Sequence, residues 1–324
     1  MYEFTLWLQQ LLGDAPAPFM LWVTDWLGPV GWLIAFGVFE VLAGIRRGLP
    51  LAFLLIFSLL LNTWLKWLWL APRPYFVSGE VVAYRATPGF GMPSGHAQGA
   101  FALWGGIGWL LRQRLGWCIV LFVLAALVAL TRVYLGVHSL AQILAGSVLG
   151  ILGIFLMAKL TPILSRRFAA WSDGRLLGLL LIVALVAAVL NTVVLAWAQG
   201  FQVPELWLQR FGEAQGQAPV TADALSLFSN GTPILLGLMV GYGVMGLFDR
   251  RFPAVLVTLR GKALALLLAV LSHLAFVVGV GALGEAGLTQ TLLEGIWVAL
   301  AVLQPILCLY LPMRISALSF EQAH

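Results

Sequence analysis

Residues 49–70 read LPLAFLLIFSLLLNTWLKWLWL, and the only charged side chain among them is Lys66. A helix of about 20 apolar residues is long enough to cross the hydrocarbon layer of a bilayer. Similar apolar runs recur along the chain, which has 324 residues, of which 61% are hydrophobic and 10% are charged. The mean hydropathy is +0.99. A soluble fold of this size needs far more charged surface, so the sequence predicts an all-α membrane protein.

The apolar runs predict about nine transmembrane helices, which we place at 26–45, 49–70, 95–111, 116–131, 139–160, 176–199, 232–248, 263–284 and 295–312. Residues 2–12 predict a short amphipathic helix on the membrane surface, with Trp7 as an interfacial anchor. We divide the chain into an amphipathic N-terminal segment (1–25), a five-helix core that carries the polar motifs (26–160) and a four-helix membrane extension (161–324).

The distribution of basic residues predicts the orientation. If the loop that holds Arg46 and Arg47 is cytoplasmic, the alternation of nine spans puts 13 of the 18 lysines and arginines on the cytoplasmic side. The N-terminus is then non-cytoplasmic and the C-terminus cytoplasmic. Three of the five exceptions are Lys66, Arg73 and Arg132, which belong to the polar motifs described below. All of the motifs are therefore predicted on one non-cytoplasmic face.

The remaining composition argues against other classes. The net charge is +5, but the basic residues flank the spans, so we interpret them as a topology signal and expect no nucleic-acid partner. Cys118 and Cys308 both lie in apolar runs and imply no disulfide framework. No lysine or arginine precedes Arg46, so we expect no cleavable signal peptide.

Three polar motifs interrupt the apolar chain. They are Lys66 with Arg73-Pro74, the run Pro93-Ser94-Gly95-His96, and Arg132 with His138. Cations and the free N–H groups at a helix N-terminus, here at Ser94 and Gly95, suit the charge on a phosphoryl group. One imidazole can attack phosphorus while the other donates a proton. Together the motifs predict a phosphohydrolase site in a membrane protein.

Each motif taken alone also has a structural interpretation. Lys66 can be an interfacial lysine whose ammonium reaches toward water, and Arg73 an ordinary juxtamembrane arginine. Ser94 can be a plain N-cap. A lone histidine at 138 is usually structural, and Arg132 and His138, six residues apart, are expected to flank a turn at Gly136. The occurrence of all three motifs on one face favours the functional interpretation.

Taken together, the motifs resemble the tripartite signature of the type-2 phosphatidic acid phosphatase superfamily, which includes lipid phosphate phosphatases, glucose-6-phosphatase and the vanadium haloperoxidases. The resemblance implies that His138 is the nucleophile, which forms a phosphohistidine, and that His96 protonates the leaving oxygen. Phosphate would be bound by Lys66, Arg73, Arg132 and the N–H groups of Ser94 and Gly95. The resemblance implies no metal and no other cofactor, and phosphate or vanadate as site ligands.

The chain departs from this signature at two positions. Gln142 stands where the superfamily usually has an aspartate that orients the nucleophilic histidine, and Thr131 stands where a serine is usual. The Gln142 carbonyl oxygen can accept the Nδ1 proton of His138, but it cannot offset a developing positive charge, so weaker catalysis is the default expectation. Another acidic residue could substitute. A glutamine at this position, with the run from Arg132 to Gly146, is similar to the glucose-6-phosphatase branch.

The nine-span topology with an outer N-terminus is also similar to that branch. The short loop between the first two motifs and the absence of a terminal dilysine signal favour a prokaryotic relative. We therefore expect hydrolysis of a phosphate monoester, with a sugar phosphate similar to glucose 6-phosphate favoured. The alternatives are a lipid phosphate or polyprenyl diphosphate phosphatase, a phosphotransferase, and a catalytically weak scaffold or transporter. The favoured location is a bacterial inner membrane with the site facing the periplasm; the alternative is the endoplasmic reticulum membrane with a lumenal site.

Overall fold

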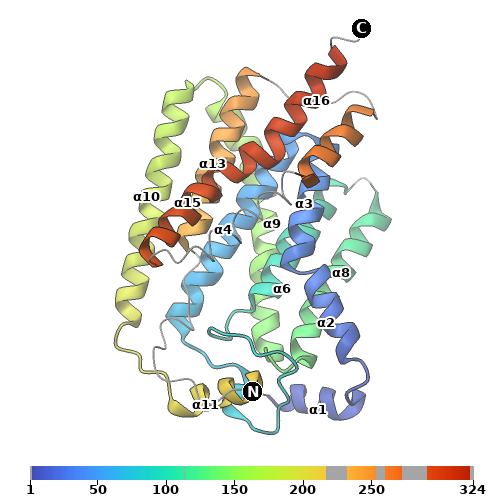
Figure 1. Cartoon of the computed structure of the whole chain (residues 1–324), viewed down its shortest axis with the longest axis vertical. Helices are drawn as coiled ribbons and strands as arrows, with labels where there is room; N and C mark the ends of the chain where they lie inside the picture. Colours follow the sequence, from blue (N-terminus) through green and yellow to red (C-terminus); the bar gives the residue numbers. More distant parts are fainter. Residues whose placement is uncertain (1, 113, 217–231, 253–259, 272–289, 322–324) are drawn as a thin grey trace. The chain divides into compact units, whose positions relative to one another are not determined.

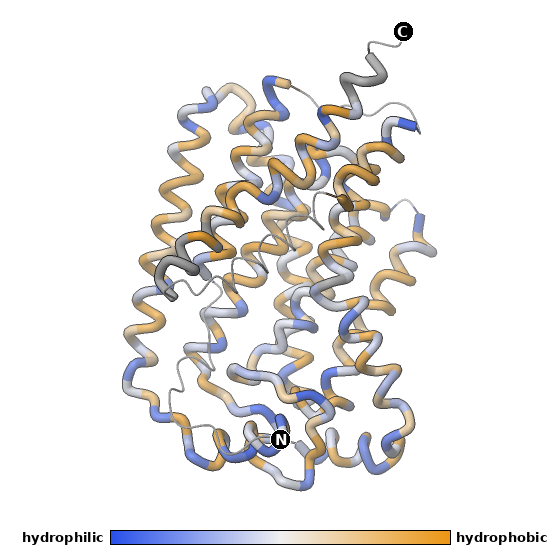
Figure 2. The backbone as a smooth tube through the Cα atoms, viewed as in Figure 1, coloured by the Kyte–Doolittle hydropathy of each residue, from blue (hydrophilic) through white to orange (hydrophobic). Residues whose placement is uncertain are grey.

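The computed structural model describes residues 2–112, 114–216, 232–252, 260–271 and 290–321, and within these ranges it contains helices and no β-strand. Hydrophobic residues run along the lengths of the helices, and hydrophilic residues gather at helix ends and in connecting segments (Figure 2). The all-α prediction is therefore confirmed for the described residues. The helices (Figure 1) are α1 (Glu3–Leu12), α2 (Ala17–Trp26), α3 (Pro29–Ala43), α4 (Ile45–Trp69), α5 (Pro74–Val77), α6 (Gly95–Ala100), η1 (Phe101–Gly105), α7 (Gly106–Leu110), α8 (Leu115–Tyr134), α9 (Leu140–Phe168), α10 (Asp173–Ala198), α11 (Glu205–Gln215), α13 (Thr232–Arg251), α15 (Gln290–Pro305), η2 (Ile306–Tyr310) and α16 (Leu311–Glu321).

Seven helical segments of the described chain are long and apolar enough to cross a membrane: Ala17–Ala43, Ile45–Val77, Leu115–Tyr134, Leu140–Phe168, Asp173–Ala198, Thr232–Arg251 and Ala299–Ser316. This is a multi-pass membrane protein. The seven segments overlap seven of the nine predicted spans, although the first one starts already at Ala17 rather than at 26.

The two other predicted spans differ in kind. The span at 95–111 is a helical run through α6, η1 and α7, but from Gly95 to Leu110 it is shorter than the about 20 residues that cross the hydrocarbon layer of a bilayer. In the span at 263–284, the part up to residue 271 is helical and the rest lies outside the described residues. The count of nine and the orientation of the termini stay predictions.

The chain forms two compact units. The first consists of Met1–Trp32, Phe57–Leu156 and Leu190–Asn230, and the second of Leu33–Ile56, Met157–Val189 and Gly231–His324. All of the motif residues belong to the first unit. The predicted division into residues 1–25, 26–160 and 161–324 follows the order of the chain, whereas each of the two units combines separate segments. The predicted boundaries stay predictions.

In the first unit, α8 is packed against α1, α2 and α6, and α11 is packed against α5. An apolar cluster supports the chain that follows α8; its buried members are Ala17, Tyr75, Phe76, Val81, Tyr134, Leu135, Val137 and Phe211. The members come from α2, α5, α8 and α11 and from the segments between helices. Because packed apolar side chains fix their backbone, this cluster holds the segment from Tyr134 to Val137 just before His138.

Helix α1 fastens to the same region. Its Gln9 side chain donates to the carbonyl oxygens of Val82 (2.8 Å) and Tyr134 (2.7 Å) and accepts from the Val82 N–H (3.1 Å). Thr5 and Gln9 are buried, whereas Trp7 is 52% exposed. Thr5 and Gln9 of α1 thus face the protein, whereas Phe4, Trp7 and Leu11 are exposed, as is expected of a helix at a membrane surface.

In the second unit, α13 packs on α15 and η2. Glu40 of α3 is fully buried, and neither of its carboxyl oxygens has a hydrogen-bond partner among the described residues. A Cβ atom at Gly48 would lie 2.6 Å from the Glu40 Cγ. Gly48 therefore leaves the room that the buried Glu40 side chain occupies.

Candidate active site

The first motif begins on α4, where Ser58, Asn62 and Lys66 follow one another at intervals of four residues. This spacing puts three polar side chains on one face of an apolar helix. The Lys66 ammonium donates to the carbonyl oxygen of Phe90 at 2.9 Å. Lys66 is thus held by the segment that leads into the second motif.

Arg73 is held by backbone carbonyls and by a histidine. Its guanidinium donates to the carbonyl oxygens of Gly89 (2.8 Å), Pro88 (2.8 Å) and Val137 (2.9 Å). Its Nη1 also lies 3.1 Å from the His138 Nε2. The side chain of Arg73 is 2% exposed. This one arginine joins the first motif to the third.

The second motif turns into α6. Ser94 is the N-cap, and its hydroxyl accepts the N–H of Ala97 at 3.4 Å. The N–H of Ser94 donates to the carbonyl oxygen of Gln142 at 3.0 Å. The Ser94 N–H, one of the predicted phosphate donors, is therefore hydrogen-bonded to α9, whereas the N–H of Gly95 has no hydrogen-bond partner among the described residues.

A glycine on α9 permits this contact between the second and third motifs. A Cβ atom at Gly146 would lie 2.4 Å from the Ser94 carbonyl oxygen, which is closer than real Cβ atoms approach. Gly150, one turn later, faces the Gln98 carbonyl oxygen in the same way, with a Cβ distance of 2.6 Å. The small residues at 146 and 150 allow α9 to approach the turn of α6 closely.

A polar network of Ser58, Asn62 and Gln98, which was not predicted from the sequence, adjoins the turn into α6. The Asn62 amide donates to the Gln98 Oε1 (2.8 Å) and to the Pro93 carbonyl oxygen (3.3 Å). The Gln98 amide nitrogen donates in turn to the carbonyl oxygen (2.6 Å) and hydroxyl (3.1 Å) of Ser58. The polar stripe on α4 was the signal that could have revealed it. The network fastens the second motif to the helix that carries Lys66.

Arg132 lies at the end of α8 and is 1% exposed. Its Nη1 donates to the hydroxyl of Thr24 on α2 at 2.8 Å. Its Nε is buried and has no partner among the described residues. Thr131, the other departure from the family signature, donates to the Val128 carbonyl oxygen at 2.7 Å. Arg132 thus keeps a buried donor available for a ligand.

The turn between α8 and α9 presents His138. Gly136 has a φ of +75°, a left-handed conformation that favours glycine. A Cβ atom there would also lie 2.2 Å from the Val82 carbonyl oxygen. The N–H groups of Val137 (3.2 Å) and His138 (3.1 Å) both donate to the Arg132 carbonyl oxygen. The expected turn at Gly136 is therefore present, and it brings Arg132 and His138 together.

The contacts of the His138 ring define its tautomer. Nδ1 lies 2.8 Å from the Gly91 carbonyl oxygen and 3.2 Å from the Gln142 Oε1. A carbonyl oxygen can only accept, so Nδ1 carries the proton, and a guanidinium can only donate, so Nε2 accepts from Arg73. The lone pair of Nε2 therefore faces the cations. A neutral imidazole in this tautomer has the nucleophilic nitrogen that attack on phosphorus requires.

Gln142 has two functions in this arrangement. Its Oε1 accepts the N–H of Ser139 (3.1 Å), and its own N–H donates to the Ser139 hydroxyl (3.4 Å). These reciprocal bonds are a capping box at the start of α9, for which the spacing of Ser139 and Gln142 was a sequence signal. The amide nitrogen of Gln142 donates to the Pro72 carbonyl oxygen at 2.8 Å. The orientation of the amide is therefore fixed at both of its ends.

His96 lies on the first turn of α6. Its ring centroid is 6.1 Å from that of Trp32, and a Cβ atom at Gly28 would be 3.4 Å from its Cδ2. A positive charge on His96 would lower the pKa of His138, and no direct hydrogen bond joins the two imidazoles among the described residues. His96 therefore borders the cation cluster without contacting the nucleophile candidate directly.

The electrostatics of the site are dominated by positive charge. Lys66, Arg73 and Arg132 make no ion pair with a carboxylate in the described part of the chain. Burial, followed by the charges of Arg73, Lys66 and Arg132, holds the pKa of His138 well below its ordinary value of 6.5. Among the described residues, no group of three or more His, Cys, Asp and Glu side chains is arranged to hold a metal ion. The cluster is suited to an anion.

An ion pair lies beside the cluster. Arg85, in the loop after the first motif, binds both carboxylate oxygens of Asp25 on α2, with an Nη2–Oδ2 distance of 2.8 Å. This contact raises the pKa of Arg85 above its ordinary value. Asp25 directly follows Thr24, whose hydroxyl accepts from Arg132, but the Asp25 carboxylate is paired with Arg85.

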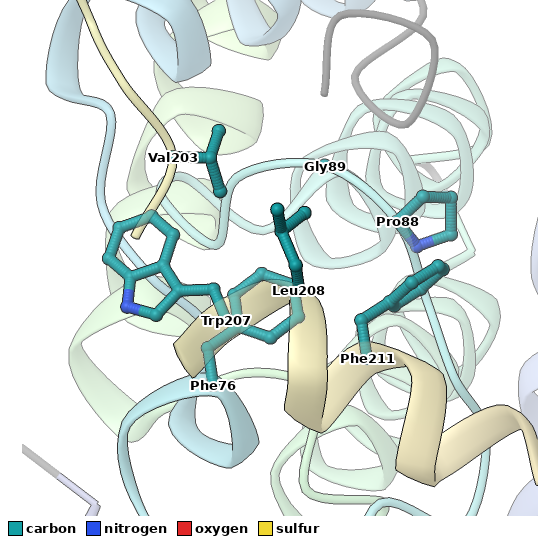
Figure 3. Close-up of a pocket in the computed structure, with 7 residues that line it drawn as sticks. All are labelled: Phe76, Pro88, Gly89, Val203, Trp207, Leu208 and Phe211. Atoms are coloured by element: carbon teal, nitrogen blue, oxygen red, sulfur yellow. The ribbon is translucent and has the colours of Figure 1, made fainter. Parts of the chain in front are cut away.

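A small apolar cavity lies beside Pro88 and Gly89 in the segment before the second motif (Figure 3). It is lined by Phe76, Pro88, Gly89, Val203, Trp207, Leu208 and Phe211. Trp207, Leu208 and Phe211 belong to α11, and Pro88 and Gly89 are the residues whose carbonyl oxygens hold Arg73. Pro88 and Gly89 therefore line the cavity and also accept the hydrogen bonds of the Arg73 guanidinium.

Comparisons with known proteins agree with the motif resemblance. Residues 47–166, which contain all three motifs, match the model of the PAP2 superfamily. Members of this superfamily are generally phosphatases. The comparisons with curated proteins and with solved structures find no match.

Proposed function

We propose that this protein is an integral membrane phosphatase that hydrolyses phosphate monoesters through a phosphohistidine on His138. The supporting observation is a cluster of three cations, two of them almost fully buried, without a carboxylate partner in the described part of the chain. Buried charges are strongly unfavourable unless they are compensated. A phosphoryl group supplies that compensation, and the Nε2 of His138 faces the same cations.

The proposed reaction has two displacement steps. The Nε2 lone pair of His138 attacks phosphorus and the bond to the ester oxygen breaks, while His96 gives that oxygen a proton. Water then attacks the phosphohistidine, His96 takes a proton from the water, and the P–N bond breaks to release inorganic phosphate. Lys66, Arg73, Arg132 and the N–H of Gly95 would stabilise the charge on the equatorial oxygens. Phosphate and vanadate are the expected site ligands.

Arg73 has a particular part in the first step. Its Nη1 donates to the Nε2 of His138, which is the lone pair that must reach phosphorus. A phosphate oxygen that takes over this N–H would free the lone pair and draw phosphorus toward it. Substrate binding and activation of the nucleophile are then one event.

Two substrate classes follow from different observations. A sugar phosphate is our first candidate, because Gln142 and its surroundings resemble the glucose-6-phosphatase branch. A phospholipid or polyprenyl phosphate is the second candidate, and the apolar cavity beside Pro88 and Gly89 favours it. We also propose that the site lies on the non-cytoplasmic face, that residues 26–160 form the catalytic core and that residues 161–324 form a membrane extension.

Phosphate release by the purified protein tests the proposal. The substrates are glucose 6-phosphate, phosphatidic acid and a polyprenyl diphosphate, each in the same detergent. Release from the sugar phosphate supports the first class, and release from either lipid supports the second. Release from none of the three, together with a failure to bind vanadate, would contradict the phosphatase proposal and favour a scaffold or transporter.

The ionisation of His138 gives an independent prediction. Burial and like charges disfavour the imidazolium form, so the His138 ring should be neutral at pH 6.5, where an ordinary histidine is half protonated. In ¹⁵N-histidine NMR spectra of the protein, we expect the His138 signals to report the Nδ1–H tautomer at pH 6.5 and to titrate only at lower pH. The signals are assigned by their loss in His138→Gln. Titration of His138 at or above pH 6.5 would contradict the lowering of its pKa by burial and by the neighbouring positive charges.

A further inference from the structure

The N-terminal segment supplies one wall of the candidate site. Helix α2 packs against α8, and its Thr24 is fully buried at the Arg132 guanidinium. The residues that follow, Gly28 and Trp32, border the ring of His96. Thr24, Gly28 and Trp32 precede residue 47, where the match to the superfamily model begins. The contacts of this segment with the site are therefore features that the motifs do not predict.

Thr24 is the described partner of the Arg132 guanidinium. The distance from the Arg132 Nη1 to the Thr24 hydroxyl is 2.8 Å, and the Thr24 oxygen must accept because a guanidinium has no acceptor. The Thr131 hydroxyl lies 3.4 Å from the same oxygen. The buried Nε of Arg132 has no partner. The Thr24 hydroxyl is thus the one hydrogen-bond acceptor of the Arg132 guanidinium among the described residues.

We propose that Thr24 is a positioning residue for phosphate binding, which acts by aiming the Arg132 guanidinium at the bound phosphoryl group. This inference rests on the proposed function. Without the hydroxyl, the buried Nη1 would lose its acceptor, and the guanidinium would turn to the nearest alternative. A long side chain that is free to turn makes poorer contacts with phosphate oxygens, although its charge is still present.

The test compares two substitutions at Thr24. Thr24→Val removes the hydroxyl and keeps the shape, whereas Thr24→Ser keeps the hydroxyl and removes the methyl group. We expect Thr24→Val to raise KM and the inhibition constant of inorganic phosphate about tenfold, since a hydrogen bond to a charged group is lost. kcat should change less than KM, and Thr24→Ser should stay within about threefold of the parent.

A matched control is available on α4. The Thr63 hydroxyl donates to the Leu59 carbonyl oxygen at 3.0 Å within the helix, and it is hydrogen-bonded to none of the three cations in the described part of the chain. Thr63→Val should leave the phosphate inhibition constant unchanged. Thr24→Ala also removes the hydroxyl, and it serves if the valine variant does not fold. An effect of Thr24→Val no larger than that of Thr63→Val, or equal losses in Thr24→Val and Thr24→Ser, would overturn the inference.

A double-mutant cycle separates positioning from general damage. When Arg132 is already alanine, removal of the Thr24 hydroxyl should not weaken phosphate binding further. Additive losses would mean that Thr24 acts on the fold and not through Arg132. A parent protein that neither releases nor binds phosphate would contradict the proposed function itself. An active parent with an unaffected Thr24→Val variant would contradict only the role of Thr24.

Discussion

Replacement of His138 by alanine is expected to abolish turnover, with a fall in kcat of about four orders of magnitude or more. The Nε2 of His138 is the imidazole nitrogen that faces the cations, and its Nδ1 proton is held by two acceptors. The measurement is phosphate release from the best substrate, combined with acid-labile incorporation of labelled phosphate into the protein. The parent should form the labelled intermediate and His138→Ala should not.

The His96→Ala variant is the internal control for this assignment. A proton donor matters most when the leaving oxygen is basic, so this variant should lose much activity on an alkyl phosphate and little on an activated aryl phosphate. His138→Ala should lose activity on both. If the two variants kept equal activity on both substrates, the two roles assigned to the histidines would be wrong.

The positions of the motifs could be predicted from the sequence because each motif contains charged or imidazole side chains within or beside a long apolar run. The contacts among them follow from the fold. The Arg73 Nη1 lies 3.1 Å from the His138 Nε2, and the Ser94 N–H donates to the Gln142 carbonyl oxygen, although the members of each pair are far apart in the sequence. The chemical roles of these residues stay predictions until turnover is measured.

Other parts of the site could not be predicted because they are backbone atoms or common side chains. The closest acceptor of the His138 Nδ1 proton is the Gly91 carbonyl oxygen, which has no sequence signature. A Cβ atom at Gly91 would lie 2.5 Å from the Gln142 amide nitrogen, so the carbonyl reaches the ring only because this residue is glycine. Thr24 was equally hidden, because a threonine in an apolar helix is ordinary until its partner is known.

The count of spans shows a similar limit. Hydropathy alone predicted the positions of the seven described helical segments that are long and apolar enough to cross a membrane, because length and apolarity are properties of the chain alone. The helical run that starts at Gly95 is shorter, and it begins at the second motif. A sequence cannot distinguish such a short buried run from a full span by apolarity, since both are surrounded by nonpolar groups.

The Gln142→Glu substitution tests why this chain has an amide where an acid is usual. A glutamate could still accept the protons of His138 and Ser139 through one oxygen. Its other oxygen would face the Pro72 carbonyl oxygen, which now receives an N–H at 2.8 Å. The new negative charge would also compete with phosphate for the three cations. We therefore expect kcat/KM to fall at least about tenfold and the inhibition constant of phosphate to rise by a similar factor.

Gln142→Met is the matched control for Gln142→Glu, because it removes both hydrogen-bonding ends of the amide without adding a charge. The Gly91 carbonyl oxygen would still accept the Nδ1 proton of His138. The methionine variant should therefore keep the affinity for phosphate better than the glutamate variant does. If Gln142→Glu instead preserved or raised kcat/KM, the amide would serve only to set the tautomer of His138. The bond to Pro72 would then be dispensable, and a carboxylate would be as good an acceptor at this position as the amide.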